Sequence, residues 1–199
     1  IHEITCDSIL INGTNATLPN YSISLGETLI KNKFSLSYLS FDAFKNFTNE
    51  VILNATFDET KIYVRDIEHF LPSISNSNFI KNNEDEYIEI SGRYFGKIAN
   101  IAGRDVDFKF GNKLSLAGSF NTRNLLDTDN AVLNIKLDRF QTSMRKIKML
   151  FPNFNLPTNF TKLGSINFTG RFDGYLQDFV AYGKLNSDLG IAEMDMRLD

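Results

Sequence analysis

Apolar and polar residues alternate along most of the chain. In five separate runs every second residue is apolar, except for Gly170 in one of them, and most of the residues between are polar or charged. Because successive side chains of a β-strand point to opposite faces, this period of two predicts antiparallel strands with one apolar face and one polar, solvent-exposed face. The apolar positions of these runs are Val106, Phe108 and Phe110; Leu114 and Leu116; Leu133, Ile135 and Leu137; Ile166, Phe168 and Phe172; and Met194, Met196 and Leu198.

Less regular alternation predicts further strands, separated by turn-forming residues. Gly111 and Asn112 lie between two alternating runs and predict a two-residue hairpin turn. The expected fold class is therefore all-β and mainly antiparallel. The further strands are expected over residues 8–11, 21–25, 34–41, 50–57, 60–65, 86–95 and 175–185.

Helix is predicted in only two short places. Residues 142–151 carry apolar side chains at helical spacing, Thr142 is a candidate N-cap, and Pro152 would end the helix. A shorter helix is predicted over residues 66–71, again just before a proline.

Two segments recur at nearly the same spacing along the chain. Residues 65–72 resemble residues 145–152, displaced by 80, and residues 90–101 align with residues 168–179, displaced by 78. The second pair shares the pattern Gly-Arg-aromatic-x-Gly, which predicts one glycine within a strand and the next at its hairpin turn.

Such repetition predicts an elongated array rather than a closed domain. We expect residues 1–199 to form a single β-rich segment of a longer protein, an elongated and curved sheet with one or two short helices. The approximate repeat units are residues 23–89, residues 90–167 and the start of a third unit at residues 168–199.

Composition narrows the classes of function. The 21 Lys and Arg against 24 Asp and Glu give a net charge of −3, which offers no electrostatic basis for binding nucleic acid. The single cysteine, Cys6, excludes an internal disulfide and a zinc site built from several cysteines.

Candidate catalytic and metal-binding groups are sparse. Neither His2 nor His69 lies in a nucleophile motif. The acidic turns at residues 84–86 and at Asp127 and Asp129 lack the spacing of a known calcium loop. We therefore expect no catalytic residue, no metal site and no cofactor, and the chain is predicted not to be an enzyme.

The second half of the chain, from about residue 90 to residue 199, resembles the periplasmic TamB/AsmA-like translocation and assembly module proteins of Bacteroidota-type bacteria. The resemblance covers a little over half of the chain, and the first 60 residues fit it poorly. It rests on five motifs and on the strand that follows Leu189 and Gly190. The motifs are Ile-Ser-Gly-Arg-Tyr-Phe-Gly-Lys-Ile at 90–98, Leu-Ala-Gly-Ser-Phe at 116–120, Phe-Pro at 151–152, Leu-Pro-Thr-Asn-Phe at 156–160, and the run from Leu163 to Gly174.

This resemblance implies a long periplasmic protein that is anchored in the inner membrane and whose strands form an open apolar groove, the β-taco. It implies a role in phospholipid transport, in outer-membrane protein assembly and secretion, or in both, with no catalytic residues. The implied partners are phospholipid acyl chains and an outer-membrane barrel protein of the Omp85 type.

The groove would be lined by the apolar side of the alternating runs. About 14 strands at roughly 4.8 Å spacing would give a groove near 65 Å long. An alternative with the same alternation is a closed β-sandwich, which would make the chain an extracellular or surface binding module for a glycan or a protein. The predicted lining residues are Val106, Phe108, Phe110, Leu114, Leu116, Phe120, Leu133, Ile135, Leu137, Ile166, Phe168, Phe172, Met194 and Met196.

Overall fold

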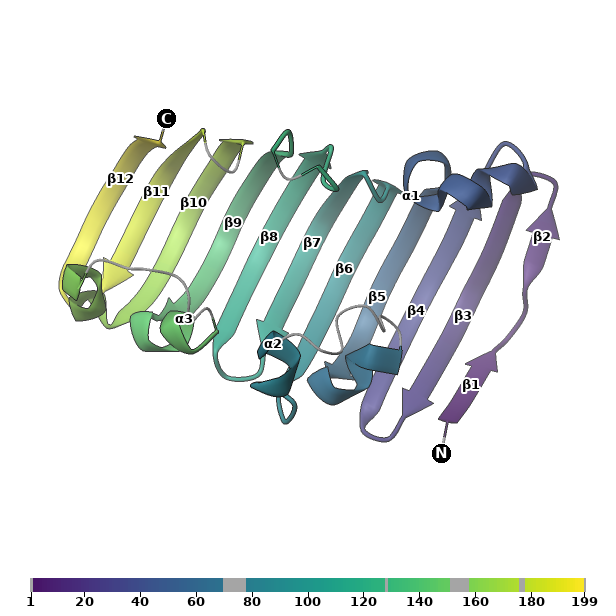
Figure 1. Cartoon of the computed structure of the whole chain (residues 1–199), viewed down its shortest axis with the longest axis horizontal. Helices are drawn as coiled ribbons and strands as arrows, with labels where there is room; N and C mark the ends of the chain where they lie inside the picture. Colours follow the sequence, from purple (N-terminus) through teal and green to yellow (C-terminus); the bar gives the residue numbers. More distant parts are fainter. Residues whose placement is uncertain (1, 70–77, 128, 151–157, 176–177, 199) are drawn as a thin grey trace.

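A computed structural model describes residues 2–69, 78–127, 129–150, 158–175 and 178–198. These residues form one antiparallel 12-stranded sheet in which strands follow one another in chain order, except that β1 and β2 both pair with β3 (Figure 1). The predicted all-β fold class is confirmed. The strands are β1 (His2–Cys6), β2 (Leu10–Asn12), β3 (Asn15–Leu25), β4 (Thr28–Ser37), β5 (Ile52–Tyr63), β6 (Tyr87–Lys97), β7 (Asn100–Phe110), β8 (Leu114–Arg123), β9 (Val132–Ser143), β10 (Ser165–Tyr175), β11 (Phe179–Ser187) and β12 (Gly190–Leu198).

Short helices connect strands at both ends of the sheet. At one end, η1 and α1 join β4 to β5; at the other end, η2 and α2 join β5 to β6, and α3 and η4 join β9 to β10 (Figure 1). No described helix is long and apolar enough to cross a membrane. The helices are η1 (Phe41–Asn46), α1 (Phe47–Glu50), η2 (Val64–His69), α2 (Asn78–Lys81), α3 (Met144–Leu150) and η4 (Thr158–Leu163).

The two faces of the sheet differ sharply in polarity. Directly paired residues lie on the same face, so the pairs Phe108–Leu116 and Leu116–Phe140 extend one apolar face, here called the inner face. The alternate pair Lys109–Ser115 belongs to the opposite, outer face. Followed strand by strand, the register places all fourteen predicted lining residues on the inner face.

The inner face also carries the helices. Val64 of η2, Ile80 of α2 and Leu150 of α3 form one buried cluster with Phe110 of β7. At the other end of the strands, Ala43 of η1 packs with Tyr38 and Val51 over Leu36. The helical segments therefore form two rims that rise from the inner face at the two ends of the strands.

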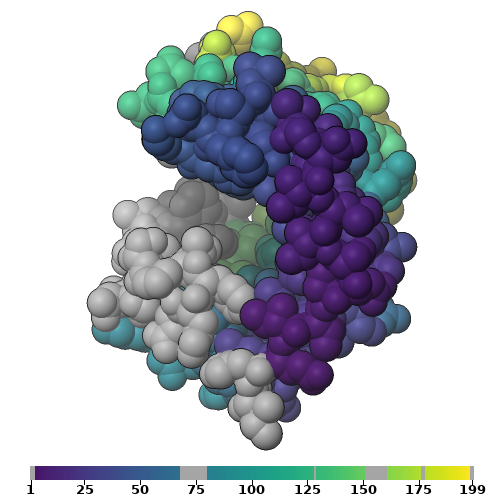
Figure 2. Space-filling view, turned by 90° about the vertical axis from the view of Figure 1, so that its right-hand side faces the viewer, coloured from purple at the N-terminus to yellow at the C-terminus, as the bar shows by residue number. Residues whose placement is uncertain are grey.

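Between the rims the sheet is hollowed. Figure 2 looks along the row of strands and shows a hollow between the first strands and the η1–α1 segment, with residues of later strands visible behind it. We call this hollow, whose floor is the inner face, the trough. The described strands form one sheet and not two packed sheets, so the closed β-sandwich of the alternative hypothesis is wrong as a fold.

The curvature coincides with a row of bulges across the middle of the sheet. Register shifts place an extra residue between Phe57 and Thr60 in β5, between Gly103 and Val106 in β7, and between Leu137 and Phe140 in β9. Two bulge residues, Glu59 and Asp105, have positive φ angles of 44° and 52°. Since a bulge bends its strand and increases the local twist, a row of bulges creases the sheet along its length.

Several local predictions need correction. The predicted strands 50–57 and 60–65 are one bulged strand, β5, and the sheet has 12 strands where about 14 were expected. Eleven strands in line at roughly 4.8 Å spacing give a trough about 50 Å long. The hairpin at Gly111 has three residues between its strands and not two, because β7 ends at Phe110 and β8 begins at Leu114, which pair directly.

Helix capping and glycine positions also differ from expectation. Helix α3 forms within the predicted range, but the Ser143 hydroxyl accepts from the N–H of Lys146, while the Thr142 hydroxyl donates to the carbonyl of Lys113. Gly96 and Gly174, expected in hairpin turns, lie inside β6 and β10. The shorter predicted helix is a 3₁₀ helix, η2, as far as residue 69, and residues 70 and 71 lie outside the described residues.

The order of elements repeats as well as the sequence. Strand β5, helix η2 and strands β6 and β7 recur as β9, α3, β10 and β11. Strand β6 begins at Tyr87 and β10 begins 78 residues later, at Ser165, and both contain the Gly-Arg-aromatic-x-Gly pattern. The unit boundaries at residues 89/90 and 167/168 fall inside these two strands, so the repeated elements are better delimited at the starts of β5 and β9.

Candidate functional site

The trough floor is a continuous apolar surface that crosses the central strands. At its centre Ala55, Tyr94 and Val106 are buried, and they come from the adjacent strands β5, β6 and β7. The side chains packed around them belong to β4 through β8 and are Phe34, Leu53, Phe57, Ile90, Ile101, Leu116 and Phe120.

The fourteen predicted lining residues divide by accessibility. Phe110, Val106 and Ile166 are buried, at 3%, 6% and 8% exposure, so they support the trough and do not line open space. Met196, at the C-terminal end of the trough, is exposed. The other ten are half-buried, as expected for side chains on the surface of a groove, and are Phe108, Leu114, Leu116, Phe120, Leu133, Ile135, Leu137, Phe168, Phe172 and Met194.

The sequence-based prediction missed the N-terminal half of the trough. The register adds Leu18, Tyr21 and Ile23 of β3, and Ile30 and Phe34 of β4, to the inner face. In β3 and β5 a bulge changes which alternate residues face inward, so that Phe57 and Thr60 share a face although they are three apart. A strict period of two therefore fails along these strands. The lining could have been found only by treating the residues before and after each bulge as two separate alternating runs.

Two buried threonines of the inner face are hydrogen-bonded to the strand backbone. The Thr60 hydroxyl accepts from the N–H of Lys31, 3.1 Å away, and donates to the carbonyl of the same residue at 2.9 Å. The Thr122 hydroxyl bonds Ile101 in the same way, at 3.0 and 2.9 Å. These hydroxyls satisfy the strand backbone and leave the floor apolar in effect.

Tyr94 is the deepest phenol of the floor. It is 8% exposed, its hydroxyl lies 3.3 Å from the carbonyl oxygen of Ser91, and its ring packs edge-on against Phe57. Burial disfavours the phenolate and raises the pKa of Tyr94 to about 12. This group therefore stays neutral under ordinary conditions and presents a hydroxyl, not a charge, to the trough.

A pH-dependent loss of stability is expected from Tyr94. Between pH 10 and 12 the unfolded chain loses this proton while the folded chain keeps it, so the free energy of unfolding falls as the pH rises. The contribution is complete below pH 10, and its loss by pH 12 amounts to about 2 kcal/mol. Urea unfolding at pH 9 to 12 should show a steeper decline for the wild type than for Tyr94→Phe, and equal declines would contradict the assignment.

The outer face is charged and open to water. Cross-strand ion pairs join Lys109 to Glu89 at 3.0 Å and Arg139 to Asp107 at 2.6 Å, with side chains that are about 40–50% exposed. Exposed pairs of this kind contribute only about 0.2–1 kcal/mol each. Their effect is to mark the outer face as solvent-facing, which leaves the trough as the apolar surface available for binding.

Within the described part of the chain no group of three or more His, Cys, Asp or Glu side chains could hold a metal ion. Asp127, one of the acidic residues considered for calcium, accepts a hydrogen bond from Asn130 at 2.8 Å. The side chains of His2 and His69 lie outside the described part of the structure.

Comparison of this chain with protein-family models, with characterised proteins and with solved structures gives no match. The fold and the site geometry therefore define the class directly. The chain is an all-β protein with an open, curved, antiparallel sheet, an apolar inner face and a charged outer face.

Proposed function

We propose that this chain is a non-enzymatic periplasmic scaffold whose trough shields apolar cargo from water. In this proposal it belongs to a longer protein anchored in the inner membrane. It acts in phospholipid transport between membranes, in the assembly and secretion of outer-membrane proteins, or in both. The observation that carries the proposal is the single open sheet with all apolar faces directed into one trough.

The physical argument concerns the cost of moving an acyl chain through water. Exposing one methylene costs about 0.8 kcal/mol, so a chain of about 16 carbons costs roughly 12 kcal/mol. A continuous apolar wall removes most of this cost at every point along a path. The half-buried Phe, Leu, Ile and Met side chains of β7 to β12 supply such a wall, and its open side would leave a polar head group in water.

The family resemblance supplies the cellular setting of the proposal. The Gly-Arg-aromatic-x-Gly strands, β6 and β10, occupy equivalent places in two repeated units, as an elongating array requires. The partner proposed on this basis is an outer-membrane barrel protein of the Omp85 type, to which the trough would deliver lipid or an unfolded client.

Site-specific photo-crosslinking tests the proposal. A benzophenone amino acid is placed at Leu133 or at Met196, both on the inner face, and at their outer-face neighbours Asn134 and Asp195 as matched controls. After irradiation in the periplasm, mass spectrometry should find phospholipid on the inner-face variants at a level at least about tenfold above the controls, because the methylenes contact only the apolar face.

The outcomes separate the possible cargoes. Phospholipid adducts confined to the inner face support lipid transport, and polypeptide adducts confined to it support client assembly. Equal crosslinking from both faces, or no inner-face adduct of either kind, would overturn the proposed function. Thermal unfolding of each variant shows whether the fold has been kept.

A further inference from the structure

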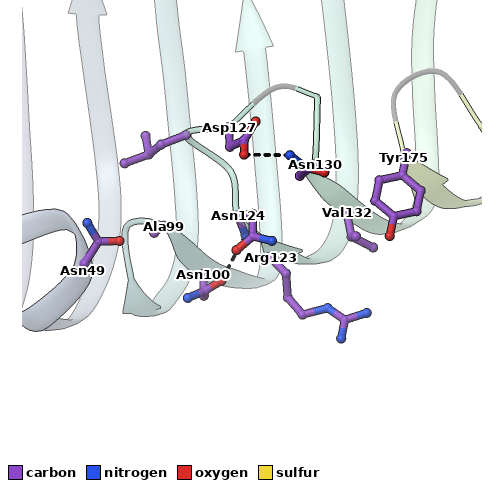
Figure 3. A pocket seen from close by; sticks show the side chains of 10 residues that line it. Asn49, Ala99, Asn100, Arg123, Asn124, Asp127, Asn130, Val132 and Tyr175 are labelled. Atoms are coloured by element: carbon purple, nitrogen blue, oxygen red, sulfur yellow. Dashed lines mark hydrogen bonds between the residues drawn. The ribbon is translucent and has the colours of Figure 1, made fainter.

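A second concave site lies outside the trough, at the end of the strands where η1 and α1 are found. We call it the rim pocket. It has a volume of about 660 Å³ and is open to solvent. Figure 3 shows its side chains, which come from α1, the β6–β7 turn, the β8–β9 loop and the adjoining ends of β7, β8, β9 and β10. The residues used below are Asn49, Asn100, Arg123, Asn124, Asp127 and Tyr175.

The sheet register places one wall of the rim pocket on the outer face. Val132 pairs with Arg123 on one side and with Tyr175 on the other, so all three share a face. The neighbouring pair Thr122–Leu133 belongs to the inner face. The part of the rim pocket formed by these three residues therefore lies on the opposite face of the sheet from the trough. Most of the other lining residues, including Asn49 of α1, lie beyond the ends of the strands.

The walls of the rim pocket are held by hydrogen bonds. The N–H of Asn124 donates to the side-chain oxygen of Asn100 at 3.0 Å, and the N–H of Leu125 donates to the carbonyl of Ala99 at 2.9 Å. The N–H of Ala99 in turn donates to the carbonyl of Thr48 in α1, at 3.0 Å. These bonds hold residues 124 and 125 against the β6–β7 turn before any ligand arrives, which reduces the entropic cost of binding.

The polar groups of the rim pocket are nearly neutral overall and of mixed character. Its lining includes one guanidinium, Arg123, and one carboxylate, Asp127, which is bonded to Asn130. The side chains of Asn49, Asn100 and Asn124 add amides, each with both donor and acceptor groups. This balance disfavours a multiply charged ligand such as a phosphate and favours a ligand rich in hydroxyl groups, each of which both donates and accepts.

An exposed aromatic ring completes the rim pocket. Tyr175 is 45% exposed and its ring projects at one end of the lining in Figure 3, opposite Asn49. An exposed phenol offers a flat apolar surface and a polar tip. The apolar C–H face of a pyranose ring can stack on such a surface while its hydroxyls reach the amides and the guanidinium.

We infer that the rim pocket binds carbohydrate, with Tyr175 as the stacking surface and the asparagines and Arg123 as hydroxyl partners. This site is independent of the trough and its cargo. It would attach the outer side of the sheet to a polysaccharide or to the sugar portion of a glycoconjugate.

Titration of the ¹⁵N-labelled protein with oligosaccharides tests the inference. The probes are maltohexaose, cellohexaose, chitohexaose and mannohexaose, each taken to millimolar concentration, and the readout is the backbone and side-chain amide signals of Asn49, Asn100 and Asn124. At least one probe should shift these signals. Tyr175→Ala should weaken that binding about five- to tenfold, the loss expected for one aromatic contact.

Tyr182→Ala is the matched control, because Tyr182 is 42% exposed on the outer face and outside the rim pocket. It should leave the affinity unchanged. The inference is overturned if no probe shifts the pocket amides, or if the two tyrosine variants lose affinity equally. Lipid crosslinking from Met196 is measured in parallel, so that failure of the sugar site and failure of the proposed function are distinguished.

Discussion

Replacing Phe110 with alanine is expected to lower the free energy of unfolding by about 3–5 kcal/mol, a large fraction of the total for a domain of this size. Phe110 is only 3% exposed and packs with Val64, Ile80 and Leu150, which come from three separate helices. Its ring therefore holds one rim of the trough onto the end of β7. Urea unfolding followed by circular dichroism measures the effect.

The control for this prediction is Phe95→Ala. Phe95 lies on the outer face of β6, is 43% exposed, and has the Arg104 guanidinium 5.4 Å from its ring centroid. Its loss should cost less than about 1 kcal/mol. If Phe110→Ala proved no more destabilising than Phe95→Ala, the packing of η2, α2 and α3 onto the inner face would be contradicted.

This contrast also sorts the lining residues by role. A buried residue such as Phe110 or Val106 holds the walls in place, so its substitution should affect folding before it affects cargo. A half-buried residue such as Leu133 or Phe168 presents apolar surface to the trough, so its substitution should affect cargo first. The sequence alone did not separate the two groups, because both occupy the same parity of the same strands.

The prediction from sequence succeeded where strands alternate without interruption. In β8, for example, Leu114 and Leu116 face inward and Ser115 faces outward, as a period of two requires. Because directly paired residues share a face, the side chains that face inward in one strand determine which side chains face inward in the next strand. In the C-terminal half the pairing register therefore puts these apolar residues on one face, as the alternation predicts.

Prediction failed where a bulge or a distant contact decides the structure. Glu59 and Asp105 carry no mark in the sequence that announces a positive φ, yet their bulges reverse the alternation and help crease the sheet. The rim pocket was also missed, because Asn49 and Tyr175 line the same pocket only after the strands between their segments have assembled in order. Such features depend on the register of many strands and leave no local pattern.

Replacing Gly170 on the inner face with alanine is expected to lower the free energy of unfolding by about 3 kcal/mol. A Cβ atom at Gly170 would collide with the carbonyl oxygen of Tyr182 and would lie 2.6 Å from the ring of Phe168 and 2.8 Å from the Cα of Gly183. Gly170 and Gly183 face each other across β10 and β11. Their missing side chains let the Phe168 ring lie flat on the floor of the trough.

Gly13→Ala separates this steric effect from the ordinary cost of replacing glycine. Gly13 has a φ of +55°, and nothing lies within 4 Å of the position that a Cβ atom would take, so its substitution meets conformational strain alone, about 1 kcal/mol. Gly170 does not have such a φ, so the cost of its substitution comes only from steric overlap of the new Cβ atom with its neighbours. Thermal and urea unfolding of the two variants should therefore rank Gly170→Ala as the more destabilising. The reverse order would mean that the β10 and β11 backbones lie further apart at Gly170 and Gly183 than these contacts require, and that the floor of the trough there is not formed by a ring lying over paired glycines.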